Sequence, residues 1–130
     1  MGFHHEHRVR YGECDMQNVV FNAHYLAFCD DAVDTWFRTL FSDGFEKYGW
    51  DFMTKKATVE WQSPARLRDV IEMDLAVARW GQTSFDVGIV GTVGDRAVFT
   101  ATLTYVGVRP STIEPIAPPD AVRSRLGEAA

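Results

Sequence analysis

The chain has 130 residues, of which 46% are apolar and 13% aromatic, and its formal net charge is −5, from 13 basic and 18 acidic side chains. This composition predicts one globular domain with a sizeable core. The negative charge argues against broad electrostatic binding to nucleic acid or to an anionic membrane, so an anionic ligand would need a local basic patch. Cys14 and Cys29 form no CxxC pair and follow no secretory signal. We therefore expect neither a disulfide framework nor a zinc site, and a cytoplasmic protein without membrane-spanning segments.

The first two predicted elements are a strand over FHHEHRVRY, residues 3–11, and a long helix from Asn22 to Phe41. Asn22 is the expected N-cap of the helix, and Gly44 follows it as a stop signal. Apolar residues recur along the helix at steps of three and four, the spacing of an amphipathic helix; they are Tyr25, Phe28, Cys29, Ala32, Trp36 and Leu40.

Beyond the helix the apolar period changes to two and β-branched and aromatic residues become frequent, which predicts strands. Four strands are expected: one beginning at Ala57, and three over 69–80, 83–93 and 96–108. The segment 80–83 and the pair Gly94-Asp95 are the turn signals between the last three strands.

The C-terminal residues 111–130 are predicted to form a Pro-rich tail outside the single domain at 1–110, with a short helix from Asp120. The predicted order is one strand, one long helix and then four consecutive strands. One antiparallel sheet must therefore cover one helix, which is an α+β arrangement.

Two stretches, VRYGECDMQNVVFNAHYLAF and VEWQSPARLRDVIEMDLAVARWGQTSF, carry a family resemblance over roughly residues 7–108. The chain resembles the hotdog-fold acyl-CoA thioesterases of the 4-hydroxybenzoyl-CoA thioesterase type. The matching positions are an aromatic-x-acid-x-Asp pattern, an apolar pair, a tyrosine and a Pro-Ala-x-x-x-Asp step: Tyr11, Glu13, Asp15, Val19, Val20, Tyr25, Pro64, Ala65 and Asp69.

The resemblance implies a curved antiparallel sheet wrapped around a long central helix, in a homodimer or homotetramer whose active sites lie between subunits. It implies hydrolysis of an acyl-CoA thioester to a free acid and coenzyme A, with no cofactor and no metal. In the family, the aspartate at the position of Asp15 attacks the thioester carbonyl or activates a water molecule.

Elementary chemistry supports the same role for Asp15. A thioester has a good leaving group, so its hydrolysis needs only a base or nucleophile and donors for the developing oxyanion. A helix N-terminus has unpaired amides, and those from Phe21 to His24 are the candidate donors. The alternative interpretation is that Asp15 only bonds loop amides, as aspartates before helices often do.

Other polar residues near Asp15 have weaker cases. Asn18, together with Gln17, is a candidate support that orients water or the thioester oxygen. Glu13 is expected to be a solvated strand residue rather than a partner of Asp15. A Cys14–His24 thiol and base is disfavoured because nothing in the sequence brings the two together. The histidines at positions 4, 5 and 7 are expected to be solvated, with no carboxylate pair to complete a metal site.

The expected substrate-binding residues are basic groups for the phosphates of coenzyme A and apolar groups for the acyl chain. Arg66 and Arg68 are the leading basic candidates, with Arg79 and Arg109 as further ones. The apolar candidates are Val20, Tyr25, Trp61 and Phe85, and for each aromatic residue among them a place in the core is the favoured alternative. Gly81, Gln82 and Thr83 stand where relatives often have basic residues, so the carrier, coenzyme A or acyl carrier protein, stays open.

Two other functions remain as alternatives. A non-catalytic module could bind acyl groups or small apolar ligands in the same groove. An acyl-thioester hydratase of the same fold would pair the aspartate with a histidine five residues later, where this chain has Val20. The length and identity of the acyl chain do not follow from the sequence.

Overall fold

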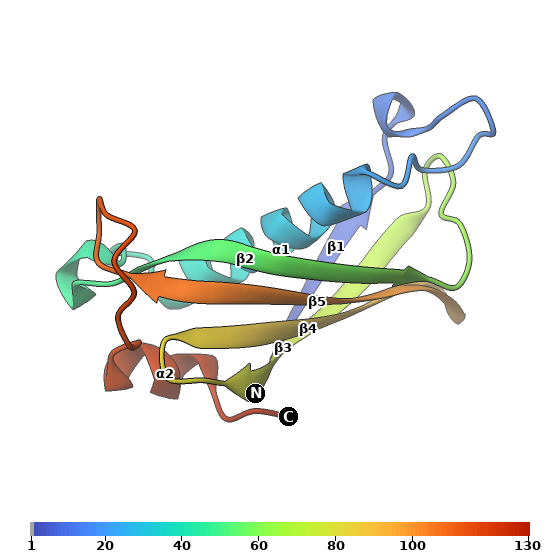
Figure 1. The fold of residues 1–130 in the computed structure, drawn as a ribbon. Helices are drawn as coiled ribbons and strands as arrows, with labels where there is room; N and C mark the ends of the chain where they lie inside the picture. The colour runs from blue at the N-terminus through green and yellow to red at the C-terminus, as the bar shows by residue number, and fades with distance from the viewer. Residues whose placement is uncertain (1) are drawn as a thin grey trace.

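The computed structural model describes residues 2–130 (Figure 1). The elements in chain order are β1 (Phe3–Arg8), the 3-10 turn η1 (Tyr11–Glu13), α1 (His24–Leu40), the 3-10 turn η2 (Glu46–Tyr48), β2 (Asp51–Trp61), β3 (Val70–Trp80), β4 (Ser84–Val93), β5 (Arg96–Val108) and α2 (Asp120–Leu126). All five expected strands and the expected C-terminal helix are present.

The strands form one curved antiparallel sheet with the order β1-β3-β4-β5-β2. Strands β3, β4 and β5 are consecutive neighbours joined by tight turns, and Gly94, with φ 59°, provides the left-handed backbone of the second turn. Strands β1 and β2 are the two edges. The sheet and the two helices give the α+β arrangement expected from the sequence, consistent with a hotdog fold.

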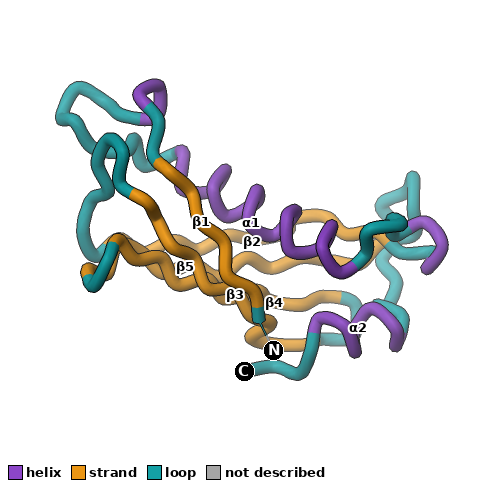
Figure 2. The backbone as a smooth tube through the Cα atoms, turned by 180° about the vertical axis from the view of Figure 1, so that it is seen from behind, coloured by secondary structure: helices purple, strands orange, loops and turns teal. Residues whose placement is uncertain are grey.

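Helix α1 lies along one face of the sheet, as the view from behind shows (Figure 2). The period-2 pattern directs alternate residues of β3, β4 and β5 toward this face, where they are almost fully buried; they include Ile71, Met73, Leu75, Val77, Phe85, Val87, Ile89, Leu103 and Tyr105. The residues of α1 that face them are Tyr25, Phe28, Cys29, Ala32, Val33, Trp36 and Phe37. The expected helical stripe is therefore the core face of α1.

Three expected boundaries are wrong. The first strand ends at Arg8 rather than at Tyr11, because Tyr11 begins the turn η1. The helix begins at His24, and its N-cap is Ala23 rather than Asn22, because Asn22 lies in a turn where its carbonyl accepts from the Tyr25 amide. Strand β2 begins at Asp51, six residues before Ala57. The first half of β2 pairs with β5 at the edge of the sheet, and of residues 51–56 only Phe52 is partly buried against the core, so there is no alternating burial that a sequence pattern could reveal.

The C-terminal segment packs against one end of the sheet. Val122 and Leu126 of α2 belong to the buried core. The Trp80 indole donates to the Gly127 carbonyl over 2.9 Å, and the Ala130 amide donates to Val77 over 2.9 Å. Neither helix in residues 2–130 is long and apolar enough to span a membrane.

Candidate active site

The connection from β1 to α1 lies beside the connection from β2 to β3, at the end of the sheet opposite helix α2 (Figure 1). Hydrogen bonds join the two connections: the Val20 amide donates to Ala65 over 2.9 Å, and the Arg68 amide donates to Val9 over 3.1 Å. Val19 also forms an isolated β-bridge with Arg66. The loop that holds Asp15 is therefore fixed against a second segment far away in the sequence.

Asp15 begins a short loop whose backbone folds back on itself. The Asp15 amide donates to Val19 over 2.9 Å, and the Asn18 amide donates to the Asp15 carbonyl over 3.0 Å. Asn18 has φ 63°, a left-handed conformation that asparagine tolerates better than most residues. The Gln17 amide donates to Asp15 Oδ1 over 2.8 Å, so one carboxylate oxygen does bond a loop amide. The other, Oδ2, has no hydrogen-bond partner among residues 2–130.

Asp15 and Asn18 line the same surface groove, which has a volume of about 590 Å³. The other lining residues are Tyr11, Gly12, Cys14, Met16 and Leu67. Tyr11 is 84% exposed and Met16 fully exposed, so two large apolar side chains flank the carboxylate without being covered by this chain. The groove thus offers apolar surface next to a half-buried acid.

The start of α1 offers fewer oxyanion donors than expected. The Phe21 amide donates to the Glu13 carbonyl and the His24 amide donates to the Phe21 carbonyl, each over 2.9 Å. Within residues 2–130, only the Asn22 and Ala23 amides of the expected group lack a backbone acceptor. These two are the candidate donors that remain.

The four expected arginines divide into two pairs. Arg79 forms an ion pair with Asp86, and Arg109 forms one with Glu114. The side chains of Arg66 and Arg68 have no ion-pair partner in the described part of the chain, and both residues are exposed beside Leu67 of the groove. Arg66 and Arg68 are therefore the pair that could meet an anionic ligand near Asp15.

The expected acyl-contacting residues do not all lie together. Val20 and Tyr25 are buried beside the loop, and the Tyr25 hydroxyl accepts from the Ala65 amide over 3.3 Å. Tyr25 meets the ring of Trp61 edge to face at 5.9 Å, and Trp61 is 49% exposed. Phe85 is fully buried at the opposite end of the sheet, against Trp80 and Tyr105, so the structure does not bring it to the groove.

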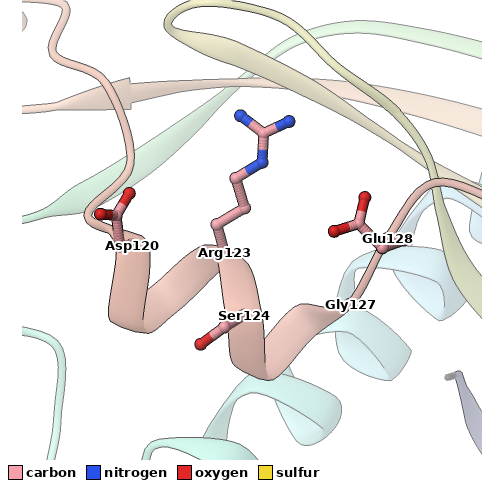
Figure 3. A pocket seen from close by; sticks show the side chains of 5 residues that line it. All are labelled: Asp120, Arg123, Ser124, Gly127 and Glu128. Carbon is pink, nitrogen blue, oxygen red and sulfur yellow. The ribbon is translucent and has the colours of Figure 1, made fainter.

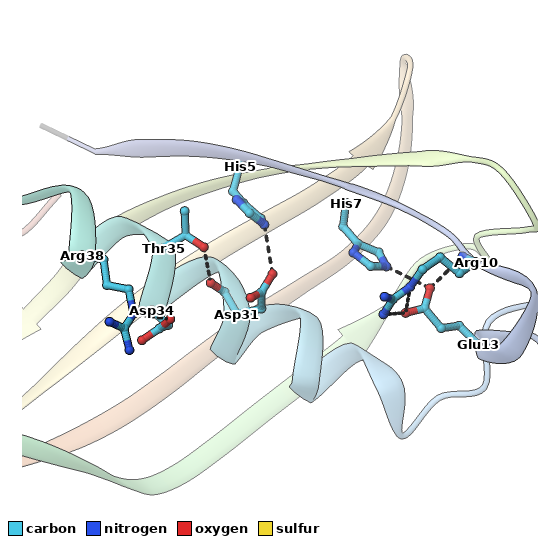
Figure 4. Close-up of polar contacts among 8 residues, drawn as sticks. All are labelled: His5, His7, Arg10, Glu13, Asp31, Asp34, Thr35 and Arg38. Carbon is cyan, nitrogen blue, oxygen red and sulfur yellow. Dashed lines mark hydrogen bonds and ion pairs between the residues drawn. The ribbon is translucent and has the colours of Figure 1, made fainter.

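Glu13 differs from its expected solvated position: it ends the turn η1 and is buried, with 7% of its surface exposed. Its Oε1 accepts from the Arg10 amide over 2.8 Å and lies 2.9 Å from His7 Nε2, and its Oε2 accepts from the Arg10 side chain over 2.7 and 3.1 Å (Figure 4). Burial alone would raise the pKa of Glu13, but the hydrogen bonds from Arg10 and His7 outweigh it and lower that pKa to about 2. Glu13 is therefore ionised at neutral pH.

The expectation of solvated histidines is likewise wrong for two of the three. His7 packs on the Phe28 ring at 4.1 Å, and His5 lies 3.3 Å from an Asp31 oxygen of α1; both imidazoles are largely buried (Figure 4). His4 lies on the exposed face of the sheet, where its ligand atom and those of Glu6 and Glu72 are within 4.8 Å of one another. The sequence could not reveal this group, because Glu72 reaches it only through the pairing of β1 with β3.

Two further features do not form a site with Asp15. No hydrogen bond joins Cys14 to His24 in the described residues; the Cys14 thiol points to the Arg10 carbonyl instead. A second depression, of about 430 Å³, lies along α2 (Figure 3), which is at the opposite end of the molecule from the connection that holds Asp15 (Figure 1). Its lining includes Arg123 together with Asp120 and Glu128, and this mixture of charges favours no particular ligand.

Comparisons with known proteins identify the family and the fold of the chain. A model of the Thioesterase-like superfamily matches residues 9–126, which include the groove, both helices and strands β2 to β5. The chain therefore belongs to the Thioesterase-like superfamily. No curated protein sequence gives a significant match.

Solved structures show the same fold at low sequence identity. A thioesterase superfamily protein from a Jannaschia species is 20% identical, with a TM-score of 0.88 over 96% of this chain and 90% of that one. A 1,4-dihydroxy-2-naphthoyl-CoA thioesterase from Synechocystis is 15% identical, with a TM-score of 0.83 over 97% and 96%. A Staphylococcus aureus protein solved in complex with CoA is 20% identical, with a TM-score of 0.82 over 96% and 81%. These identities establish the likeness of fold only.

Proposed function

We propose that this protein hydrolyses acyl-CoA thioesters to a free acid and coenzyme A, with Asp15 as the base or nucleophile. The observation that carries the proposal is the half-buried Asp15 carboxylate, which keeps one oxygen free of hydrogen bonds at the edge of an apolar groove. Membership of a thioesterase superfamily and thioester hydrolysis by proteins of the same fold support it.

Two routes are open to Asp15. As a base, its free oxygen takes a proton from water while the water oxygen attacks the thioester carbon, and the thiolate leaves with that proton. As a nucleophile, the same oxygen attacks the carbon directly, the thiolate leaves, and water then hydrolyses the resulting anhydride. In both routes the Asn22 and Ala23 amides are the donors for the oxyanion, and Asn18 is a support that orients water or the thioester oxygen.

The carrier in this proposal is coenzyme A, and Arg66 and Arg68 bind its phosphates. Both guanidinium groups lack an ion-pair partner in the described residues, so they are available to an anion. The CoA bound to the Staphylococcus aureus protein is a ligand of that protein, and it supports the choice of carrier only through the shared fold.

The working unit is a homodimer or homotetramer in the cytoplasm, with α1 as the central helix of the hotdog fold. Strand β2 is an 11-residue edge strand, exposed along most of its length, and an open edge of this length favours pairing with another strand. A bulge at Lys55 interrupts it, so the segment from Ala57 to Trp61, beside Tyr25, is the part suited to pairing. Pairing there would cover Trp61 and place a second subunit next to the groove.

Release of free thiol from a panel of aliphatic and aromatic acyl-CoAs tests the function. Turnover of at least one substrate is expected, and tight binding without turnover of any would instead indicate a non-catalytic acyl-binding module. A single turnover in ¹⁸O-water separates the two routes, because label in Asp15 indicates a nucleophile, whereas label found only in the product acid favours a base. A hydratase remains disfavoured, since buried Val20 occupies the position of its histidine.

A further inference from the structure

Among the residues that the structure describes, Glu13 is the single buried charged residue. Removing a carboxylate from water is costly unless hydrogen bonds replace the lost hydration. Here the replacement is complete: the two Glu13 oxygens meet the Arg10 amide, the Arg10 guanidinium and the His7 ring (Figure 4). Because the ionised carboxylate only accepts, the facing His7 nitrogen must carry a proton.

These partners come from the end of β1 and from the segment just after it. His7 belongs to β1 and is held by its stacking on Phe28 of α1, and Arg10 follows β1 directly. Glu13 therefore joins the strand and, through His7, the helix to the start of the connection between them. One of the four hydrogen bonds, that with His7, reaches β1, and the other three come from Arg10 within the connection itself.

The main chain of Glu13 forms the base of the loop that holds Asp15. Its carbonyl accepts from the Phe21 amide over 2.9 Å, Cys14 then bridges Val20, and the Asp15 amide donates to Val19. The two sides of the loop are thus joined by a short series of backbone pairs that begins at Glu13, and Asp15 lies two residues further on. A shift of Glu13 would move the Asp15 carboxylate relative to the start of α1.

From this geometry we infer that Glu13 is a positioning residue, whose buried carboxylate holds the loop in the place where Asp15 can act. The inference rests on the proposed role of Asp15. Catalytic rates fall steeply when a reacting group moves by about an ångström. Loss of the hydrogen bonds of the Glu13 carboxylate should therefore affect turnover more than substrate binding. Glu13 itself does not line the groove and touches no substrate.

The test is Glu13→Gln, made both in the parent protein and in an Asp15→Asn background. Glutamine keeps the size of the side chain, but its amide nitrogen would face the donors of His7 or Arg10. In the parent, kcat for the best acyl-CoA should fall about tenfold and KM should stay within about twofold. In the Asp15→Asn background, the residual rate should change less than about twofold, because the group being positioned is already absent.

Glu114→Gln is the matched control, because it makes the same change in the exposed ion pair with Arg109 and should leave kcat unchanged. If Glu13→Gln does not fold, Arg10→Gln replaces it: that side chain is exposed and the Arg10 amide still donates to Glu13. A smaller loss of kcat, about threefold, is then expected, again only when Asp15 is present.

Three results would overturn the inference or its basis, and they can be told apart. A parent-like kcat in Glu13→Gln, or in the folded Arg10→Gln, would show that the hydrogen bonds of the Glu13 carboxylate do not affect turnover. An equal fold-loss in both backgrounds would show a general structural role that does not act through Asp15. A parent-like rate in Asp15→Asn would instead remove the proposed function, and this inference with it.

Discussion

At the scale of single residues, the sequence predicted that Asp15 and Asn18 lie close together, but it did not predict the burial of Glu13. Asp15 and Asn18 are neighbours in sequence, so a local motif was sufficient to place both at one groove. Glu13 is buried only because the turn η1 brings it back onto His7 and Arg10. No periodicity in the sequence reports such a turn, and a strand continuing through it would have left Glu13 solvated.

Glu13 should also make the protein sensitive to acid. Its pKa is about 2 in the folded protein, against 4.5 ordinarily, so its contribution to stability is complete above pH 4.5 and is lost as the pH falls toward 2. That contribution is at most about 3 kcal/mol. Chemical denaturation of the parent and of Glu13→Gln across pH 2.5–6 measures it: the difference in unfolding free energy should shrink steadily with falling pH. A difference independent of pH would contradict the lowered pKa.

Arg66 and Arg68 are the residues on which the choice of carrier depends. If they bind phosphates equally in the ground and transition states, Arg66→Ala or Arg68→Ala should raise KM for acyl-CoA several-fold and leave kcat nearly unchanged. A short thioester without the nucleotide should be unaffected. Arg109→Ala, which removes an arginine already paired with Glu114, is the control. Equal losses on both kinds of substrate would point to a role of these arginines in folding or acyl positioning.

At the scale of elements, the patterned segments were predicted well and the unpatterned ones poorly. Helix α1 and strands β3 to β5 each bury one face, and this burial produces the periods of 3.6 and 2 that the sequence contains. Strand β2 has a single partly buried residue, Phe52, along its first half, and its start was missed. Phe85 lies far from the groove because it is near the start of β4, at the opposite end of the sheet from the loop that holds Asp15. Local sequence does not encode which end of a strand lies near that loop.

The C-terminal helix is predicted to stabilise the domain. Leu126 is fully buried, so Leu126→Ala should lower the free energy of unfolding by about 2–5 kcal/mol through lost burial and a cavity. Ser124→Ala, an exposed change in the same helix, should stay within about 0.5 kcal/mol of the parent. Urea denaturation compares the two. A Leu126→Ala protein as stable as the parent would mean that α2 does not pack on the core in solution.

At the scale of the whole molecule, the sequence predicted the α+β fold because each level of the pattern agreed with it. The alternating strands, the amphipathic helix and the turn signals all specify one antiparallel sheet with one helix on its face. The mode of assembly could not be predicted in the same way, because the sequence pattern of one chain does not indicate what covers an exposed edge strand.

Pairing through β2 makes a direct prediction about assembly. Thr58→Lys places a charge at an exposed position of the edge segment from Ala57 to Trp61, and two such charges would approach each other across a two-fold interface. The variant should therefore shift toward monomer in light scattering at micromolar concentration and lose activity in parallel. Thr102→Lys, an exposed change on the neighbouring strand β5, should stay assembled. A parent protein that is already monomeric and fully active would exclude a shared active site.

The most direct test of the central claim is the turnover of Asp15→Asn on the best acyl-CoA substrate. Asparagine keeps the size of the side chain and an oxygen to accept from the Gln17 amide, but it is neither a base nor a nucleophile. We predict a folded protein with the parent's oligomeric state, with KM little changed and kcat lower by roughly a hundredfold or more. A rate near that of the parent would contradict the account, because it would leave Asp15 with no role beyond bonding the amide of its own loop.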